Sequence, residues 1–350
     1  MLRTNMESPL VSIIIPCRNE AKFFGKCLES VLANDFPKDQ LEILIIDGMS
    51  EDKTREIING YAESHTFIRV LENPGQIVPT ALNIGIKNAA GQIIIRMDAH
   101  NIYSKDYISK CVQYLKKYNV DNVGGILVTL PGADTVVAQS IALALSHPFG
   151  VGNAYYRVGS KEPKLVDTVP FGCYRKDVFE RIGLFDEDLV RNQDDEFNMR
   201  LTKNGGEILL VPDIISYYYA RDTLSKLSRM LFQYGYFKPL VVKKVGSVLT
   251  WRQLIPSLFI TSLIISGILS LMTKYFFVVF ILIFLSYLFT NIFFSLIITL
   301  NKGIKYLLFL PAVFTIMHCS YGIGYLKGVI DFILLRKHRS DAKQDIKITR

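Results

Sequence analysis

The sequence predicts an α/β protein with a doubly wound, mostly parallel sheet and helices on both faces, followed by transmembrane helices near the C-terminus. Residues 8–130 alternate short β-branched runs with helical stretches, and the runs are mainly apolar, as strands covered on both faces are. Residues 251–350 contain three long segments that have no Asp, Glu, Lys or Arg. A length of 350 residues suits such a two-part chain.

The elements of the N-terminal half follow one another in a regular order. The expected strands are Val11–Ile15, Ile43–Ile46, Phe67–Leu71, Ile93–Met97 and Val123–Val128. The expected helices are Ala21–Ala33, Thr54–Tyr61, Thr80–Ala89 and Ser104–Tyr118. Ligands bind beyond the carboxyl ends of the strands in such sheets. We therefore expect the chemistry in the loops that follow Ile15, Ile46 and Met97.

The pattern is more mixed over residues 131–250. We expect a loop at Gly150–Gly159 and a short strand at Ile208–Val211. The helical stretches here are Val136–Leu145, Asp177–Ile182, Asp194–Lys203 and Thr223–Tyr236. We assign residues 1–245 to one cytoplasmic domain.

The membrane domain is expected over residues 246–335, with apolar spans at about 254–272, 275–300 and 306–326, and the basic tail is 336–350. At about 1.5 Å per residue, even the shortest of the first two spans reaches about 28 Å, close to the thickness of a hydrocarbon core. The third span contains Pro311, His318 and two glycines, so a kinked or re-entrant form stays open.

The flanking charges give two conflicting indications of topology. Lys243, Lys244 and Arg252 precede the first span and place the N-terminal domain in the cytoplasm. Three crossings would then put the tail outside, although Arg336–Arg339 favours the inside. An even number of crossings removes the conflict. One apolar segment would then lie in the interface or re-enter, and the sequence leaves open which one.

Charge and cysteine content exclude several classes of function. The net charge of +8 arises wholly within residues 251–350, where it flanks apolar segments, so we expect no nucleic-acid partner. The five cysteines include no C-x-x-C pair, which argues against a disulfide framework or a structural zinc site. The polar Met1–Pro9 stretch has no apolar core, so no secretory signal is expected.

Three acidic positions are candidates for chemistry. Asp47 ends a strand, where its carboxylate can accept a hydrogen bond from a base or ribose, whereas Asp52 is expected to cap the next helix. Asp98 and His100 stand two residues apart after the fourth strand and suit one Mg²⁺ or Mn²⁺ ion, although a structural role for His100 stays open. Asp194 lies in an acidic helix start and is either a general base or a partner of the helix dipole.

Four motifs, in this order, resemble the family-2 inverting glycosyltransferases of the GT-A fold: VSIIIPCRNE, IIDGMSEDKT, RMDAH and RNQDDEFNMRLTKNGG. The resemblance covers about residues 10–245. The stretches Pro170–Arg175 and Ile182–Glu187 are similar to the succinoglycan-type glucosyltransferases, bacterial membrane enzymes that extend lipid-linked polysaccharide repeats.

The resemblance implies a role for each matching residue. Those implied to bind the nucleotide sugar are Pro16, Arg18, Glu20, Asp47, Asp98, Arg229 and Gln233, with Tyr234 beside the last of them. Asp98 and His100 would hold the metal and the diphosphate, and Asp194 would be the catalytic base. The chain departs from the family pattern at His100, where a carboxylate is usual, at Gln193, where Glu is usual, and at Cys17, where an aromatic residue is frequent.

The implied activity is inverting transfer of a sugar from a nucleotide-diphosphate sugar, first among them a UDP-sugar, to a lipid-linked glycan. This would serve exopolysaccharide, capsule or cell-surface glycan synthesis with Mg²⁺ or Mn²⁺. A multi-pass protein of the bacterial cytoplasmic membrane is expected, with its catalytic domain in the cytoplasm. Two alternatives are a synthase that charges polyprenyl phosphate with a sugar and a non-catalytic membrane component that binds sugar.

Overall fold

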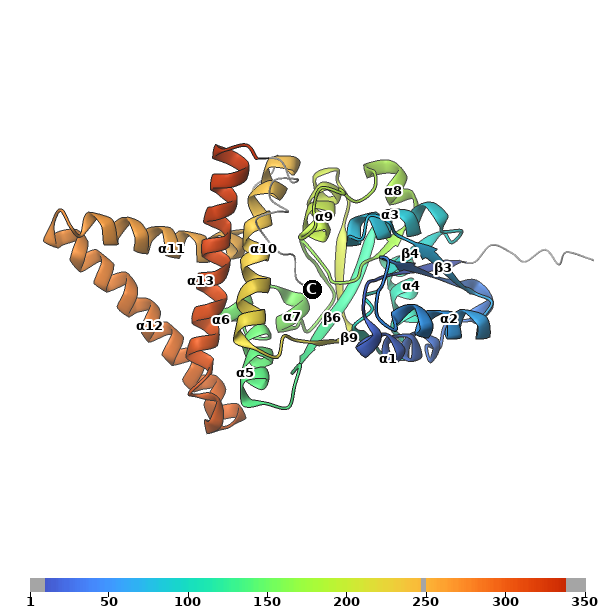
Figure 1. Cartoon of the computed structure of the whole chain (residues 1–350), viewed down its shortest axis with the longest axis horizontal. Coiled ribbons are helices and arrows are strands. Elements are labelled where there is room, and N and C mark those ends of the chain that lie inside the picture. The colour runs from blue at the N-terminus through green and yellow to red at the C-terminus, as the bar shows by residue number, and fades with distance from the viewer. Residues whose placement is uncertain (1–9, 247–249, 338–350) are drawn as a thin grey trace, which may run out of the picture. The chain divides into compact units, whose positions relative to one another are not determined.

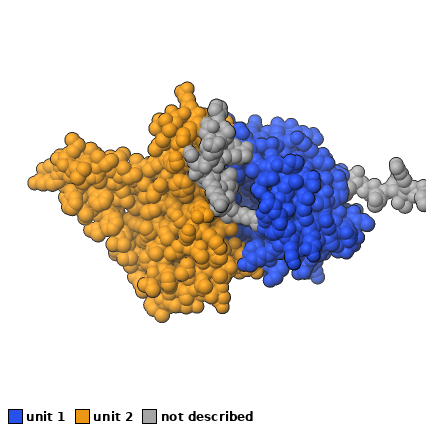
Figure 2. Space-filling model, viewed as in Figure 1, with its two compact units in different colours: residues 1–128, 159–218 blue, residues 129–158, 219–350 orange. Residues whose placement is uncertain are grey.

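The computed structural model describes residues 10–246 and 250–337, and these form parts of two compact units. The first unit spans residues 1–128 and 159–218, and the second spans residues 129–158 and 219–350 (Figure 2). Helix α10 thus belongs with the apolar C-terminal helices by its contacts. The domain boundary expected near residue 245 stays a prediction.

The sheet is built from nine strands in the order β3-β2-β1-β4-β8-β6-β9-β5, with β7 paired to β9. The strands are β1 (Val11–Cys17), β2 (Leu41–Asp47), β3 (Ile68–Glu72), β4 (Ile93–Arg96), β5 (Asn101–Tyr103), β6 (Asn122–Leu130), β7 (Lys164–Leu165), β8 (Cys173–Arg175) and β9 (Ile208–Tyr219). Pairing is parallel from β3 to β4. It is antiparallel where β8 joins β4 and β6, and where β5 and β7 join β9. The predicted α/β class is confirmed, with a mixed sheet.

Helices cover the parallel half of the sheet (Figure 1). The helices of the first unit are α1 (Ala21–Leu32), α2 (Thr54–Ser64), α3 (Val78–Asn88), α4 (Tyr107–Tyr118), α8 (Asp177–Ile182) and α9 (Gln193–Lys203), and a short 3₁₀ turn, η1, covers Lys38–Gln40. Every residue of β1 and β2 is buried, which explains why both strands are mainly apolar. A Cβ at Gly85 of α3 would lie 2.5 Å from Ile14 Cγ2, so glycine lets α3 approach β1 closely.

Several short elements differ from the sequence-based expectation. Strands β5 and β8 have three residues each, too few to show a period, and β9 continues far beyond Val211 through polar Asp213 and Ser216. The expected loop at 150–159 overlaps two one-turn helices, α6 (Pro148–Val151) and α7 (Tyr155–Val158).

The second unit consists of helices, apart from the ends of β6 and β9. Besides α6 and α7 they are α5 (Val136–Leu145), α10 (Leu224–Val245), α11 (Trp251–Leu269), α12 (Lys274–Lys302) and α13 (Leu310–Gly328), with a 3₁₀ turn η2 (Ile304–Tyr306) and a π-helical turn η3 (Val329–Leu334). Helix α10 was expected to end near Tyr236, but it runs on through Pro239, which is buried inside the unit. Helices α11 and α12 are long and apolar enough to cross a membrane, judged by length and composition only.

The third apolar segment forms α13, which packs closely along α10. A Cβ at Gly324 would lie 2.2 Å from Phe232 O, and one at Gly235 would lie 2.1 Å from Tyr321 O. The glycines between α10 and α13 therefore let the two helix backbones approach each other closely. The residues of α13 that are buried inside the unit are Leu310, Val313, Phe314, Met317, His318, Gly322, Gly324 and Gly328.

Candidate active site

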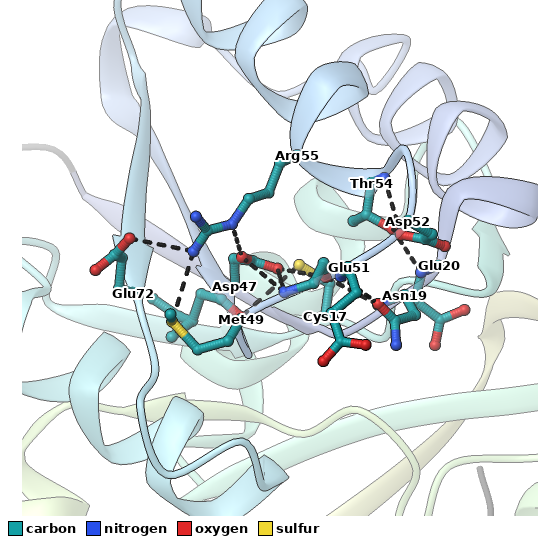
Figure 3. Close-up of polar contacts among 12 residues, drawn as sticks. Cys17, Asn19, Glu20, Asp47, Met49, Glu51, Asp52, Thr54, Arg55 and Glu72 are labelled. Atoms are coloured by element: carbon teal, nitrogen blue, oxygen red, sulfur yellow. Dashed lines mark hydrogen bonds and ion pairs between the residues drawn. The ribbon is translucent and has the colours of Figure 1, made fainter.

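The loops that leave β1 and β2 are joined by hydrogen bonds at the carboxyl edge of the sheet (Figure 3). The Asn19 amide donates to Ser50 Oγ at 2.8 Å, and the Glu51 amide donates to Asn19 Oδ1 at 2.7 Å. Asp52 accepts from the amide and hydroxyl of Thr54 and from the Ala21 amide. It therefore fixes the starts of α2 and α1 together, a structural role in line with the cap expected of it.

Asp47 ends β2 as a buried carboxylate with several partners (Figure 3). Ser50 Oγ donates to its Oδ1 at 2.5 Å, and Arg55 Nε lies 2.6 Å from its Oδ2. The second arm of the Arg55 guanidinium reaches Glu72 Oε1 at 3.1 Å. The hydrogen bond that Arg55 donates to Asp47 raises the pKa of the Arg55 guanidinium. Asp47 thus stands where the sequence placed it, in one orientation set by Ser50 and Arg55.

Two further residues of the expected nucleotide pocket lie on the β1 edge. Pro16 pairs with Ile46 of β2, beyond the part of β1 that pairs with β4. Arg18 follows, and its buried Nε has no hydrogen-bond partner among the residues that the structure describes. A Cβ at Gly48 would lie 3.2 Å from Arg18 Cβ, so the β2 loop holds the base of this side chain. A fixed stem and an unsatisfied N–H suit an anionic ligand.

At the end of β4, one buried guanidinium joins the two carboxylates that carry the expected chemistry. Arg96 donates to Asp98 Oδ1 from Nη2 at 2.9 Å and from Nε at 3.2 Å. Its Nη1 forms an ion pair with Asp194 Oδ1. The Arg96 side chain is 8% exposed, and those of Asp98 and Asp194 are 21% and 35% exposed. Asp98 and Asp194 are therefore brought together at one place, although 96 positions of sequence separate them.

Asp194 lies in the first turn of α9, directly after Asn192, which takes a left-handed conformation with φ 61°. Burial raises the pKa of its carboxyl group, and the charge of Arg96 opposes this shift. A carboxylate with a raised pKa binds a proton more readily near neutral pH, which suits a general base. The structure thus places Asp194 at the start of α9, and its role as the base stays a prediction.

His100 lies on the loop after β4 and faces Glu20 of the β1 loop. Its Nδ1 is 3.5 Å from Glu20 Oε1, and its ring centroid is 6.1 Å from that of Tyr218. Within residues 10–246 and 250–337, no group of three or more His, Cys, Asp and Glu side chains is arranged to hold a metal ion. The roles of Asp98 and His100 as metal ligands stay predictions, and Glu20 lies beside the imidazole of His100.

The remaining predicted residues belong to the second unit. Arg229 is exposed on α10, and Gln233, four residues further along the same helix, is fully buried. Their roles toward the donor or acceptor stay predictions, as do those of the other site residues.

Sequence reasoning missed Arg96 and Arg55 as partners of the acidic residues. A signal for Arg96 was present, since it is the only charged residue within the apolar Ile93–Met97 run, and a buried charge in a strand needs a partner. Arg55 gave no comparable signal, because it stands in a polar helix start.

Comparison with known proteins identifies the family of this chain. The family described as "Glycosyl transferase family 2" matches residues 12–183. A Methanococcus voltae protein named dolichyl N-acetyl-alpha-D-glucosaminyl phosphate 3-beta-D-2,3-diacetamido-2,3-dideoxy-beta-D-glucuronosyltransferase is 32% identical over 333 residues, which cover 91% of this chain and 97% of that protein. The succinoglycan biosynthesis protein ExoA of Rhizobium meliloti is 29% identical over 246 residues, which cover 70% of this chain and 73% of that protein.

Among solved structures, the mannosyltransferase PcManGT from Pyrobaculum calidifontis, in complex with GDP-Man and Mn²⁺, is similar with a TM-score of 0.56 and 17% identity. The likeness covers 90% of this chain and 87% of that one, and it shows the fold alone. Both the GT-A fold and the resemblance to family-2 enzymes are confirmed. The protein is a glycosyltransferase, and the chain belongs to glycosyltransferase family 2.

Proposed function

We propose that this glycosyltransferase is membrane-bound and inverting, and that it moves a sugar from a nucleotide-diphosphate donor, first a UDP-sugar, to a sugar already carried on a lipid phosphate. The observation that carries the proposal is that Arg96 joins Asp98, at the end of β4, to Asp194, at the start of α9. The acceptor class is supported by the Methanococcus voltae relative, whose name specifies a dolichyl-phosphate-linked sugar. The product would enter exopolysaccharide, capsule or another cell-surface glycan, made at the bacterial cytoplasmic membrane.

The donor side of the site consists of fixed polar groups. In this proposal Asp47, oriented by Arg55 and Ser50, accepts hydrogen bonds from the base or ribose. Pro16 and Glu20 shape the pocket wall. Arg18, whose buried Nε has no partner among the described residues, donates to the anionic part of the donor. Arg229 and Gln233 would act on the diphosphate or acceptor side.

Asp98 and His100 would hold a divalent metal ion together with the donor diphosphate and water. One carboxylate and one imidazole fit Mn²⁺ or Mg²⁺, since such ions keep several non-protein ligands in nucleotide sites. When bound, the ion stabilises the negative charge that develops on the leaving diphosphate. Asp98 must then share its oxygens between this role and Arg96, while Glu20 faces the Nδ1 of His100.

Asp194 would accept the proton of the acceptor hydroxyl as that oxygen attacks the anomeric carbon. A positioned base of this kind contributes about 10²–10⁴-fold to the rate. Arg96 holds the carboxylate in place through its ion pair. Because a single displacement inverts the anomeric centre, an α-linked donor gives a β-linked product.

The experiment uses the purified full chain in detergent with a panel of nucleotide sugars, Mn²⁺ or Mg²⁺, and two acceptors. One acceptor is a polyprenyl-phosphate-linked monosaccharide and the other is bare polyprenyl phosphate. We expect nucleoside diphosphate release with the first acceptor and a new glycosidic bond, and none with Asp194→Asn. Release only with bare polyprenyl phosphate would identify a lipid-phosphate sugar synthase instead. If the protein binds a nucleotide sugar but turns over no donor, it is a sugar-binding component and not a transferase.

A further inference from the structure

We propose that α13 does not cross the membrane. In this arrangement α11 and α12 form a helical hairpin that crosses the membrane and returns, and Arg336 and Lys337, which follow α13, lie on the same side of the membrane as the catalytic unit. The inference rests on the membrane attachment in the proposed function. It removes the conflict between three apolar segments and two sets of flanking cations that both favour the cytoplasm.

The first step is that α13 runs parallel to α10 and stays in contact with it. Ser228 Oγ lies 2.8 Å from Ser320 Oγ near the start of this contact. A Cβ at Gly328 would lie 2.1 Å from Tyr236 O, near its end. Helix α10 is not a membrane span, because it carries five cations over its length: Lys226, Arg229, Lys238, Lys243 and Lys244. Since α13 keeps α10 beside it, both remain outside the hydrocarbon core.

Elements that precede the spans in the chain contact α13 and the turn before it, in addition to the contacts that α12 makes. His318 Nε2 lies 2.8 Å from the carbonyl oxygen of Phe149 on α6. Just before α13, the Tyr306 hydroxyl donates to Gln139 Oε1 of α5 at 3.0 Å. The buried apolar residues of α13 thus face protein, and their composition needs no lipid to explain it.

The decisive contact lies at the turn Asp331-Phe332, in η3. Lys243, which precedes the hairpin in the chain, donates from Nζ to Phe332 O at 3.0 Å. Lys337, which follows α13, places its Nζ 3.5 Å from Asp331 Oδ1. A third crossing would separate these two lysines by about 30 Å of hydrocarbon. They instead meet at adjacent residues, so the two ends of the apolar region lie on one side.

Asp331 itself fixes this turn. Its buried carboxylate accepts from the Tyr236 hydroxyl at 2.8 Å and pairs with Lys327 Nζ at 2.9 Å. Desolvation raises the pKa of this carboxyl, but hydrogen bonds from Lys327 and Tyr236 outweigh it, and the net shift is downward. A charged Asp331 therefore holds the end of α13 to α10.

Helix α11 starts beside α13 and α12 ends beside it, and the loop of residues 270–273 joins the two helices away from α13 (Figure 1). A Cβ at Gly322 of α13 would lie 2.5 Å from Pro256 O of α11, and Asn291 Nδ2 of α12 donates to Thr315 Oγ1 at 3.0 Å. With 19 residues, α11 is about 28 Å long, close to the thickness of a hydrocarbon core. The loop then reaches the opposite interface, where Lys274 and the 74% exposed Tyr275 fit.

The end of the unit fits the surface of the near leaflet. Four exposed aliphatic residues follow one another closely there: Ile330, Ile333, Leu334 and Leu335. Exposed Arg336 comes next, and exposed Lys243 and Lys244 end α10. Apolar side chains beside cations are typical of a segment that lies on an anionic bilayer surface.

Cysteines introduced one at a time into the full-length protein test this arrangement, because the natural cysteines other than Cys319 are buried. Ser64→Cys reports the side of the catalytic unit, Thr273→Cys the hairpin loop, Lys305→Cys the end of α12, and Ala342→Cys the tail. A membrane-impermeant maleimide is applied to right-side-out and inverted vesicles, in a Cys319→Ser background that serves unmodified as the blank. Carbonate extraction of the same vesicles tests membrane attachment separately.

We expect Ser64, Lys305 and Ala342 variants to be labelled from one face and the Thr273 variant from the other. Labelling of the Ala342 variant from the face opposite to Ser64 would mean a third crossing and would overturn the inference. Labelling of all four variants from one face would overturn the proposal that α11 and α12 cross the membrane. Release of the protein by carbonate would instead contradict the membrane attachment on which the inference rests.

Discussion

Removal of the Arg96 guanidinium is expected to weaken both the fold and the reaction. Arg96 donates twice to Asp98 and pairs with Asp194, and its own side chain is 8% exposed. Loss of one member of a fully buried ion pair costs about 3–5 kcal/mol. Since the two carboxylates are 21% and 35% exposed, water screens part of this loss. For Arg96→Met we expect a decrease of about 2–3 kcal/mol in the free energy of unfolding.

The kinetic consequence of Arg96→Met follows from the same contacts. Burial already raises the pKa of Asp194, and Arg96 opposes that shift, so the variant should raise this pKa further. A base must be deprotonated, so the acid limb of the kcat profile should move to higher pH. Because Asp194 also loses its orientation, we expect kcat to fall by about 10²-fold or more.

The assays are denaturant unfolding and pH-dependent release of nucleoside diphosphate, with Arg96→Lys as the matched control. Lysine keeps the charge but not the fork of donors, so it should hold one carboxylate and recover part of the stability. An Arg96→Met variant with unchanged kcat and an unchanged acid limb would refute the idea that Arg96 positions Asp194.

Two further predictions concern the metal and the membrane unit. His100→Ala should raise the Mn²⁺ concentration that gives half of full activity, and His100→Asp should retain activity with a shift in preference toward Mg²⁺. If the activity of His100→Ala depends on Mn²⁺ concentration as that of the natural protein does, His100 is not a metal ligand. A chain that ends at residue 245 should be poorly soluble, because it exposes the face of α10 that α13 covers. Light scattering of that fragment, measured beside the full chain in the same detergent, checks this. A monodisperse fragment would contradict the prediction.

The sequence predicted the parallel half of the sheet because β1 and β2 are seven residues long and wholly buried, and because helices separate its strands along the chain. It also placed Asp47, Asp98 and Asp194 at strand ends or a helix start, where the structure has them. The short strands β5 and β8 could not be predicted, since three residues carry no period and their pairing depends on distant partners.

Contacts between distant segments were beyond the sequence. The link from Arg96 to Asp194 joins residues 98 positions apart, and the link from Ser228 to Ser320 joins residues 92 positions apart. An apolar helix has the same composition whether lipid or protein covers it. The sequence therefore predicted α13 as a candidate span, and only its contacts with α10 and α6 indicate what lies against it.

The most direct test of the account is the turnover of Asp194→Asn measured beside its donor affinity. Asparagine keeps the size of the side chain but cannot take up the proton from the hydroxyl group of the acceptor sugar. We expect turnover to fall by at least about 10²-fold, while the affinity for the nucleotide-sugar donor changes little. An Asp194→Asn enzyme that keeps more than about a tenth of the natural turnover would show that Asp194 is not the base.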